Sequence, residues 1–183
     1  EDDKLLLQLY LSDWDYLDKQ VGTIEERMLF LIQQQHSTTL ELLQNVPGIG
    51  KQSAQTIIAE VGSNLSAFAS ADHFTSWMGL APGNRQSANK WYAQHITKGN
   101  KYLRATLIQV AWAAVRTKNG YWQAQFSYLR KRLPAKKAIV AIARKIAKLI
   151  YRVITQQYQY EEKGAVHFIN QRGKWYAPKT VAG

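Results

Sequence analysis

The 183-residue sequence contains no cysteine. Disulfide bonds and thiolate metal sites are therefore excluded, and the absence is usual in an intracellular protein. No run of about 18 apolar residues occurs, so the sequence predicts no membrane-spanning helix. The N-terminus also lacks the pattern of a signal peptide. We expect a cytoplasmic protein that does not enter a membrane.

Acidic residues are missing from the whole span between His73 and Tyr160. The same span holds 16 of the 24 lysine and arginine residues, and the chain carries a net charge of +11. A long folded segment with one sign of charge is suited to a polyanion, and nucleic acid is the first candidate. A basic surface that serves only solubility is the alternative, although such surfaces usually mix both signs.

The missing carboxylates also bear on metal chemistry. A Mg²⁺-dependent nuclease site needs hard oxygen ligands, mostly from aspartate and glutamate, and the basic span has none. His73 and His95 lack a second ligand at zinc-binding spacing. We therefore expect no metal site and no cofactor in this chain, and any Mg²⁺ would be bound by carboxylates elsewhere.

Apolar periodicity indicates a mainly α fold. Apolar residues recur every three to four positions, and no stretch shows a convincing strand pattern. With 46% hydrophobic residues the chain can bury a core. We expect a coiled-coil or helical-hairpin segment at 1–40, a helical domain at 41–160 and an irregular tail at 161–183.

Residues 5–42 read as one long helix or two. Their apolar residues alternate spacings of three and four over more than three heptads, which favours a coiled coil and a homo-oligomer. Packing against another part of the protein is the alternative, because two of the side chains are large for a two-stranded seam. The seam consists of Leu7, Tyr10, Trp14, Leu17, Val21, Ile24, Met28 and Leu31.

The segment 42–62 resembles a helix-hairpin-helix motif. Gly48 and Gly50 would let the backbone turn tightly and approach a phosphate. The free N–H groups at the start of the second helix would then face the anion, with Lys51 beside them. Such contacts hold DNA without reading its sequence. A hairpin used only for packing remains the alternative.

Further helices are expected at 69–80, with Ser70 as N-cap, and at 98–118, 121–132 and 134–160. The last of these carries a basic stripe at spacings of seven, four and four, opposite an apolar face. The stripe suits contacts to a DNA or RNA backbone, with a solvated helix face as the alternative. Its members are Lys137, Arg144, Lys148 and Arg152.

Between these helices, the loop from Gly79 to Arg104 carries a single serine, Ser87. A serine in a polar loop is most often structural. A serine among cations is also suited to nucleophilic attack on a phosphodiester, because the cations offset charge in the transition state. The candidate cations are Arg85, Lys90, Lys98, Lys101 and Arg104.

Five blocks of sequence occur in an order that resembles one family. They are VPGIGKQSAQTIIAEVG, MGLAPGNRQSANK, ITKGNKYLRATLIQVAWAAVRTK, KKAIVAIARKIAKLIYRVI and GAVHFINQR. Over about residues 40–172 the chain is similar to the C-terminal transposase domain of the "one-ten" insertion-sequence family, whose relatives include pilin-gene invertases. Many members have Ser-Gly where this chain has Ser87-Ala88, and Ser-Ala also fits one branch.

The resemblance implies a DNA recombinase in which Ser87 becomes covalently linked to DNA. It also implies an N-terminal RNase-H-like half with acidic Mg²⁺ ligands, without which this chain would be inactive, and a joining coiled coil similar to residues 5–35. Some family members use a bridge RNA as guide, so RNA is a second expected partner beside DNA. Two other interpretations remain open: a non-catalytic helix-hairpin-helix DNA-binding module, and a basic RNA-binding scaffold.

Overall fold

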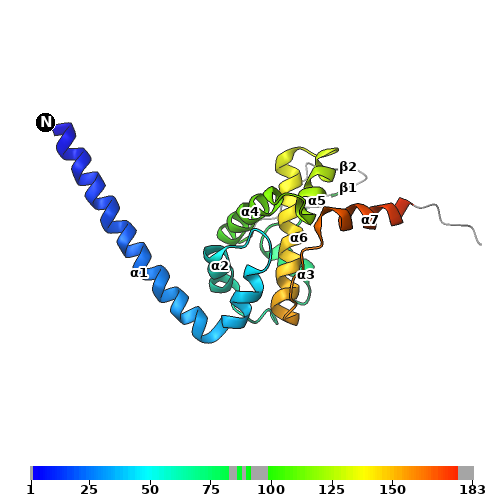
Figure 1. The fold of residues 1–183 in the computed structure, drawn as a ribbon, viewed down its shortest axis with the longest axis horizontal. Coiled ribbons are helices and arrows are strands. Elements are labelled where there is room, and N and C mark those ends of the chain that lie inside the picture. The colour runs from blue at the N-terminus through cyan, green and yellow to red at the C-terminus, as the bar shows by residue number, and fades with distance from the viewer. Residues whose placement is uncertain (1, 83–85, 88–89, 92–98, 177–183) are drawn as a thin grey trace, which may run out of the picture. The chain divides into compact units, whose positions relative to one another are not determined.

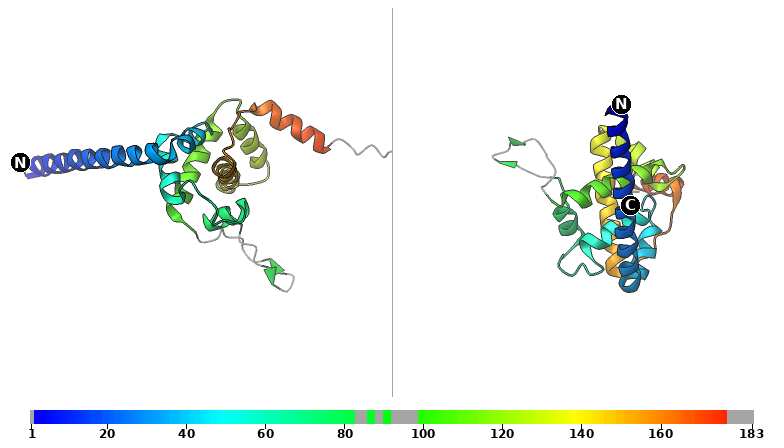
Figure 2. Two further views of the ribbon diagram at one scale, coloured as in Figure 1. Left: turned by 90° about the horizontal axis from the view of Figure 1, so that it is seen from below. Right: turned by 90° about the vertical axis from the view of Figure 1, so that its left-hand side faces the viewer.

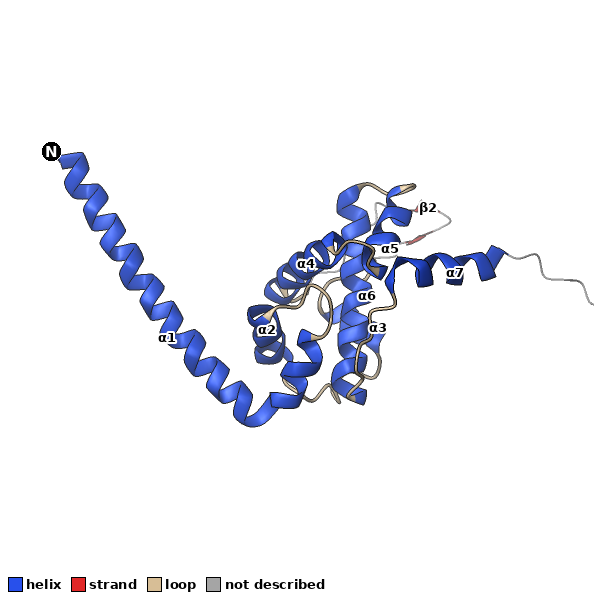
Figure 3. Cartoon of the chain, in the orientation of Figure 1, coloured by secondary structure: helices blue, strands red, loops and turns tan. Residues whose placement is uncertain are grey.

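The computed structural model describes residues 2–82, 86–87, 90–91 and 99–176, with side chains at 2–82 and 99–171. The described part is dominated by helices, which confirms the expected mainly α fold (Figures 1 and 3). In chain order the elements are α1 (Asp2–Gln44), α2 (Lys51–Val61), α3 (Ala71–Trp77), β1 (Gln86–Ser87), β2 (Lys90–Trp91), α4 (Lys101–Arg116), α5 (Tyr121–Arg130), α6 (Ala135–Gln156) and α7 (Gly164–Tyr176).

The long N-terminal helix α1 contains a bend. His36 has non-helical backbone angles, φ −139° and ψ 26°, and the chain divides into two compact units directly after it, at residues 37 and 38. The first unit is a helix whose seam residues are mostly exposed, among them Trp14 at 72% and Ile24 at 60%. Within the described residues of this unit, no other element packs on its apolar stripe.

Helix α6 is the centre of the second unit. Its apolar residues recur on one face and are buried, with Ile142, Ile146 and Ile150 each fully inaccessible. This face packs against α3, α4 and α5, which surround α6 in the views of Figure 2. Alanines at positions 138, 143 and 147 let the neighbouring helices come close. No helix in the described residues is long and apolar enough to cross a membrane.

The turn between α1 and α2 is held against α4 by Gly48. This glycine has φ +87°, and a Cβ atom there would overlap the carbonyl oxygen of Val110 and lie 2.7 Å from the amide nitrogen of Ala114. Leu43 and Val46, which flank the turn, are also buried. Only glycine therefore allows both the left-handed turn and the close contact with α4.

The C-terminal tail differs from the expectation. Residues 161–183 were predicted to be irregular, but Gly164–Tyr176 forms helix α7. The Glu162 carboxylate accepts a hydrogen bond from the Gly164 backbone N–H at 2.9 Å, and Phe168 is buried beside Tyr121 and Tyr128 of α5. The prediction was wrong because docking on α5 stabilises a helix whose own apolar pattern is weak.

Candidate nucleic-acid interface

The ends of the loop that carries Ser87 are held together. A Cβ atom on Gly99 would overlap the backbone at Trp77 and Gly79, so the backbones are in direct contact there. The Asn100 N–H also donates a hydrogen bond to the carbonyl oxygen of Trp77 at 3.2 Å. The loop thus leaves from the end of α3 and returns at the start of α4 through one closed neck.

Asn100 connects this neck to α2. Its side-chain oxygen accepts hydrogen bonds from the backbone N–H groups of Tyr102 and Leu103, both at 3.0 Å, and so caps α4. Its amide nitrogen donates to the Glu60 carboxylate at 2.6 Å. Glu60 therefore fixes the orientation of the capping amide. Sequence reasoning missed Glu60, because its partner lies 40 residues away.

Two of the expected loop cations lie in the described part beside the neck. Lys101 is exposed and lies over the ring of Tyr102 at 5.1 Å, and Arg104 is half-buried one turn later. Both belong to the first turns of α4, where the helix dipole adds positive potential. Lys101, Tyr102, Asn100, Glu60 and Trp77 line an open surface pocket at this place.

Ser87 and Lys90 lie in the short hairpin of β1 and β2. The strands pair antiparallel, and Ser87 stands opposite Lys90 in the register, although no strand was expected here. The structure does not describe their side chains. Arg85 and Lys98 lie outside the described residues, as does His95. The backbones of Ser87, the candidate nucleophile, and Lys90, a candidate cation, are thus paired. The positions of Arg85 and Lys98 are not described.

The residues of the expected helix-hairpin-helix motif differ in their exposure and contacts. Gly48 is half-buried, and the position of its missing Cβ is occupied by the backbone of α4, so its close contact is with the protein. Gly50 is exposed, has open space where a Cβ would lie, and precedes α2 without a side-chain cap. Lys51 is exposed beside it. Of the three residues, Gly50 and Lys51 are those on the surface, at a helix start suited to an anion.

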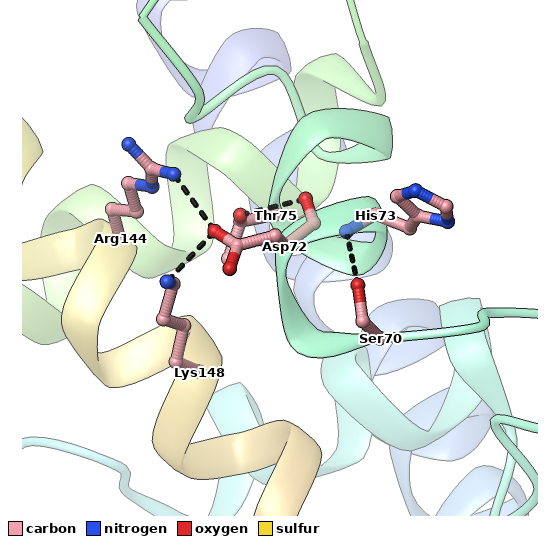
Figure 4. A network of polar contacts seen from close by, with 6 residues as sticks. All are labelled: Ser70, Asp72, His73, Thr75, Arg144 and Lys148. Atoms are coloured by element: carbon pink, nitrogen blue, oxygen red, sulfur yellow. Dashed lines mark hydrogen bonds and ion pairs between the residues drawn. The ribbon is translucent and has the colours of Figure 1, made fainter.

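The basic stripe on α6 has an acidic neighbour. Arg144 Nη2 and Lys148 Nζ both contact Oδ1 of Asp72 on α3, at 2.9 and 2.7 Å (Figure 4). Lys148 and then Arg144 hold the pKa of the Asp72 carboxyl below its usual value. The Ser70 side chain accepts a hydrogen bond from the His73 N–H at 3.3 Å, which confirms the expected cap of α3 (Figure 4).

The outer members of the stripe are separate from this cluster. Lys137 is exposed near the start of α6, and the Arg152 guanidinium lies over the Tyr158 ring at 4.3 Å near its end. Fifteen residues of helix separate the two, a rise of about 22 Å. The four cations therefore cannot gather around a single phosphate, and together they suit an extended backbone. In the described residues no group of three histidine or carboxylate side chains could hold a metal ion.

Part of the chain that forms this surface matches a known protein family. Residues 40–127 match the family model described as "Transposase IS116/IS110/IS902 family". This match includes the α1–α2 turn, the loop with Ser87, and helices α2 to α4 with most of α5.

Curated relatives agree with the family model. The chain is 32% identical over 128 residues to the "Pilin gene-inverting protein" of Moraxella bovis, which is 67% of this chain and 38% of that protein. It is 29% identical to the "Probable family 20 transposase" of Pseudomonas aeruginosa, over 79% of this chain and 45% of the relative. It is also 29% identical to the "Transposase for insertion sequence element IS1111A" of Coxiella burnetii, over 78% of this chain and 40% of the relative. The chain thus spans less than half the length of these relatives.

Proposed function

Because the chain carries a domain of the IS116/IS110/IS902 transposase family, we propose that it is the part of a DNA recombinase that binds DNA and supplies Ser87 as nucleophile. The observation that most directly supports this proposal is the closed neck at Gly79 and Gly99. It brings the two ends of the serine loop to the positively polarised start of α4, where Lys101 and Arg104 lie.

The proposed reaction is attack of the Ser87 Oγ on a DNA phosphorus. The hydroxyl proton leaves, a P–O bond to serine forms, and the P–O bond to one deoxyribose oxygen breaks. That oxygen takes up a proton and departs as a free hydroxyl. Lys101 and Arg104, with Arg85, Lys90 and Lys98 of the loop, would offset the charge that builds up on the phosphoryl oxygens.

Activation of the serine needs a group beyond the described surface, because a hydroxyl is a weak nucleophile while it keeps its proton. We propose that a carboxylate-rich RNase-H-like half, implied by the resemblance, completes the site. Mg²⁺ bound there would lower the pKa of a coordinated hydroxyl and polarise the phosphate. Asn100 at the neck and its partner Glu60 on α2 would hold the ends of the loop in a fixed position relative to that half.

Self-association through α1 belongs to the same proposal. The seam of residues 7–31 is mostly exposed within its own unit and has heptad spacing. A second copy of the helix would cover it and bring two loops into one assembly. DNA is the proposed substrate, and a guide RNA is a proposed further partner for the cations on α6.

The test is recombination by the protein joined to its acidic half. We expect Ser87→Ala to lower strand transfer to background while DNA affinity stays within about twofold, because a nucleophile acts in the transition state. Ser127→Ala, at an exposed serine of α5, is the matched control and should leave both unchanged. Recombination that survives in Ser87→Ala would favour the second candidate, a non-catalytic DNA-binding module, which the exposed helix start at Gly50 and Lys51 also supports.

A further inference from the structure

A second pocket lies on the part of the molecule formed by α5, α6 and the segment before α7, apart from the serine loop. Its volume is about 200 Å³. This is smaller than the roughly 300–1,000 Å³ of pockets that take drug-sized ligands, so it has room for one planar ring system. Tyr121, Trp122, Tyr158, Tyr160 and His167 supply aromatic walls.

The aromatic side chains form an ordered cluster. The rings of Tyr121 and Trp122 meet edge to face, with centroids 5.3 Å apart, and His167 lies 6.4 Å from Tyr121. The Arg152 guanidinium is stacked on Tyr158 at 4.3 Å. Edge-to-face and stacked geometries of this kind are those in which aromatic groups also receive a flat ligand.

Hydrogen bonds to one carboxylate fix the frame of the pocket. Glu162 accepts bonds from the Tyr121 N–H at 2.8 Å, the Gly164 N–H at 2.9 Å and the Tyr160 hydroxyl at 2.7 Å. Burial, and then Glu162, raises the pKa of Tyr160, so this hydroxyl stays protonated and committed to Glu162. Glu162 thus links Tyr121, Tyr160 and the start of α7 at one edge of the pocket.

One polar atom of the wall has no partner. Trp122 is only 5% exposed, and its indole N–H is buried without a hydrogen bond in the described part of the structure. It lies near enough to the Tyr160 hydroxyl to oppose the shift of that pKa, but does not reach hydrogen-bond geometry. Because this N–H is buried, a ligand in the pocket would contact the ring of Trp122 rather than its N–H.

We propose that this pocket binds an unpaired nucleobase of a single-stranded nucleic acid. The aromatic walls stack on the base, and Arg152 and Lys163, which also line the pocket, contact the flanking phosphates. Glu161 also lines the pocket and disfavours an anion inside it, which places the phosphates at the rim. The inference rests on the proposed function in one respect only, that the chain binds nucleic acid.

The experiment uses the chain with short single-stranded oligonucleotides that carry 2-aminopurine at one position. The fluorescence of this base falls when it stacks on an aromatic ring. Oligonucleotides with an abasic residue at that position measure what the base itself contributes. Because stacking of one base typically stabilises binding by about 1–3 kcal/mol, the abasic strand should bind about 5-fold to 150-fold more weakly. DNA and RNA versions of each strand show which source is preferred.

Two variants test the walls. Tyr158→Leu should lose the fluorescence change and bind the intact strand as weakly as the abasic one, whereas Tyr158→Phe should behave as the wild type because the ring is kept. Lys163→Gln, an exposed position, should weaken binding of the single strand more than Lys118→Gln, an exposed lysine outside the pocket. Duplex DNA binding should be unchanged in Tyr158→Leu, which also shows that this variant is folded.

The outcomes separate the two proposals. Equal binding of intact and abasic strands, or equal binding by Tyr158→Leu and Tyr158→Phe, would overturn the proposal that the pocket binds a nucleobase. If duplex DNA were still bound, the proposed function would stand. If the wild-type chain bound neither duplex nor single strands, the proposed function would fail first, and the nucleobase pocket with it.

Discussion

Helices α1 and α6 have the same kind of sequence pattern but opposite surroundings. Both carry apolar residues at helical spacing, yet Ile146 of α6 is fully buried and Ile24 of α1 is 60% exposed. The apolar face of α6 is covered by three other helices of the same chain. The pattern therefore predicts an apolar face reliably, but it does not tell whether the cover comes from the same chain or from a partner.

The largest expected effect comes from truncating the buried isoleucine. Ile146→Ala removes three carbon atoms from a packed core, and should lower the free energy of unfolding by about 2–5 kcal/mol. Urea denaturation followed by circular dichroism measures the loss. A change below about 0.5 kcal/mol would show that α6 is not the centre of the core.

The same substitution in α1 should have a different result. Ile24→Ala should leave the unfolding of the second unit within about 0.5 kcal/mol of wild type, because the side chain lies in the other unit and is exposed. If a second copy covers the seam, the variant should instead weaken self-association, which light scattering over a concentration series would detect. An unchanged mass at every concentration would contradict pairing through α1.

For the glycines of the α1–α2 turn we expect a smaller loss of stability than for Ile146→Ala. Gly48→Ala should destabilise the fold by about 1–3 kcal/mol, because of its positive φ and its contact with α4. Gly50→Ala should cost at most about 1 kcal/mol, since alanine is only a somewhat poorer N-cap and the space is open. Thermal unfolding of both variants checks this order. Equal losses would contradict the assignment of Gly48 to packing.

The smallest effect on stability is expected at Asp72, an exposed ion-pair partner. Its folded pKa is lowered below the ordinary 3.8, so the ion pairs stabilise the fold above that pH, and this stabilisation is lost as the pH falls through the lower folded value. Asp72→Asn should remove that dependence in acid titrations of stability.

The same variant should strengthen nucleic-acid binding, because Arg144 and Lys148 lose their carboxylate partner. We expect the slope of log affinity against log salt to steepen by up to about two, which is one phosphate contact for each cation. Asp18→Asn in α1 is the control for net charge. An unchanged slope in Asp72→Asn relative to this control would remove α6 from the proposed interface.

The sequence allowed prediction of what depends on local pattern. The mainly α fold, the long N-terminal helix and the Ser70 cap each depend on neighbouring residues, and the structure confirms them. Helix α7 was missed because it depends on the burial of Phe168 against α5. Asp72 was missed as a partner of the stripe because 72 residues separate it from Arg144, and no local pattern reports such a contact.

The candidate site could be predicted only in part for the same reason. The serine loop and its cations stand out in the sequence, but the neck that closes the loop requires the backbones at Gly79 and Gly99 to meet in the fold. The glycines of the hairpin look equivalent in sequence, yet one packs inward and the other is exposed. Which side of a residue faces the core and which faces solvent can be seen only in the tertiary structure.

The most direct measurement is a search for a covalent protein–DNA adduct. The protein joined to its acidic half would be incubated with Mg²⁺ and DNA carrying both element ends, then denatured and digested for peptide mass spectrometry. The account predicts a nucleotide linked to Ser87, absent from Ser87→Ala. Strand cleavage with no adduct on any residue would contradict it, because water or a DNA hydroxyl would then be the nucleophile.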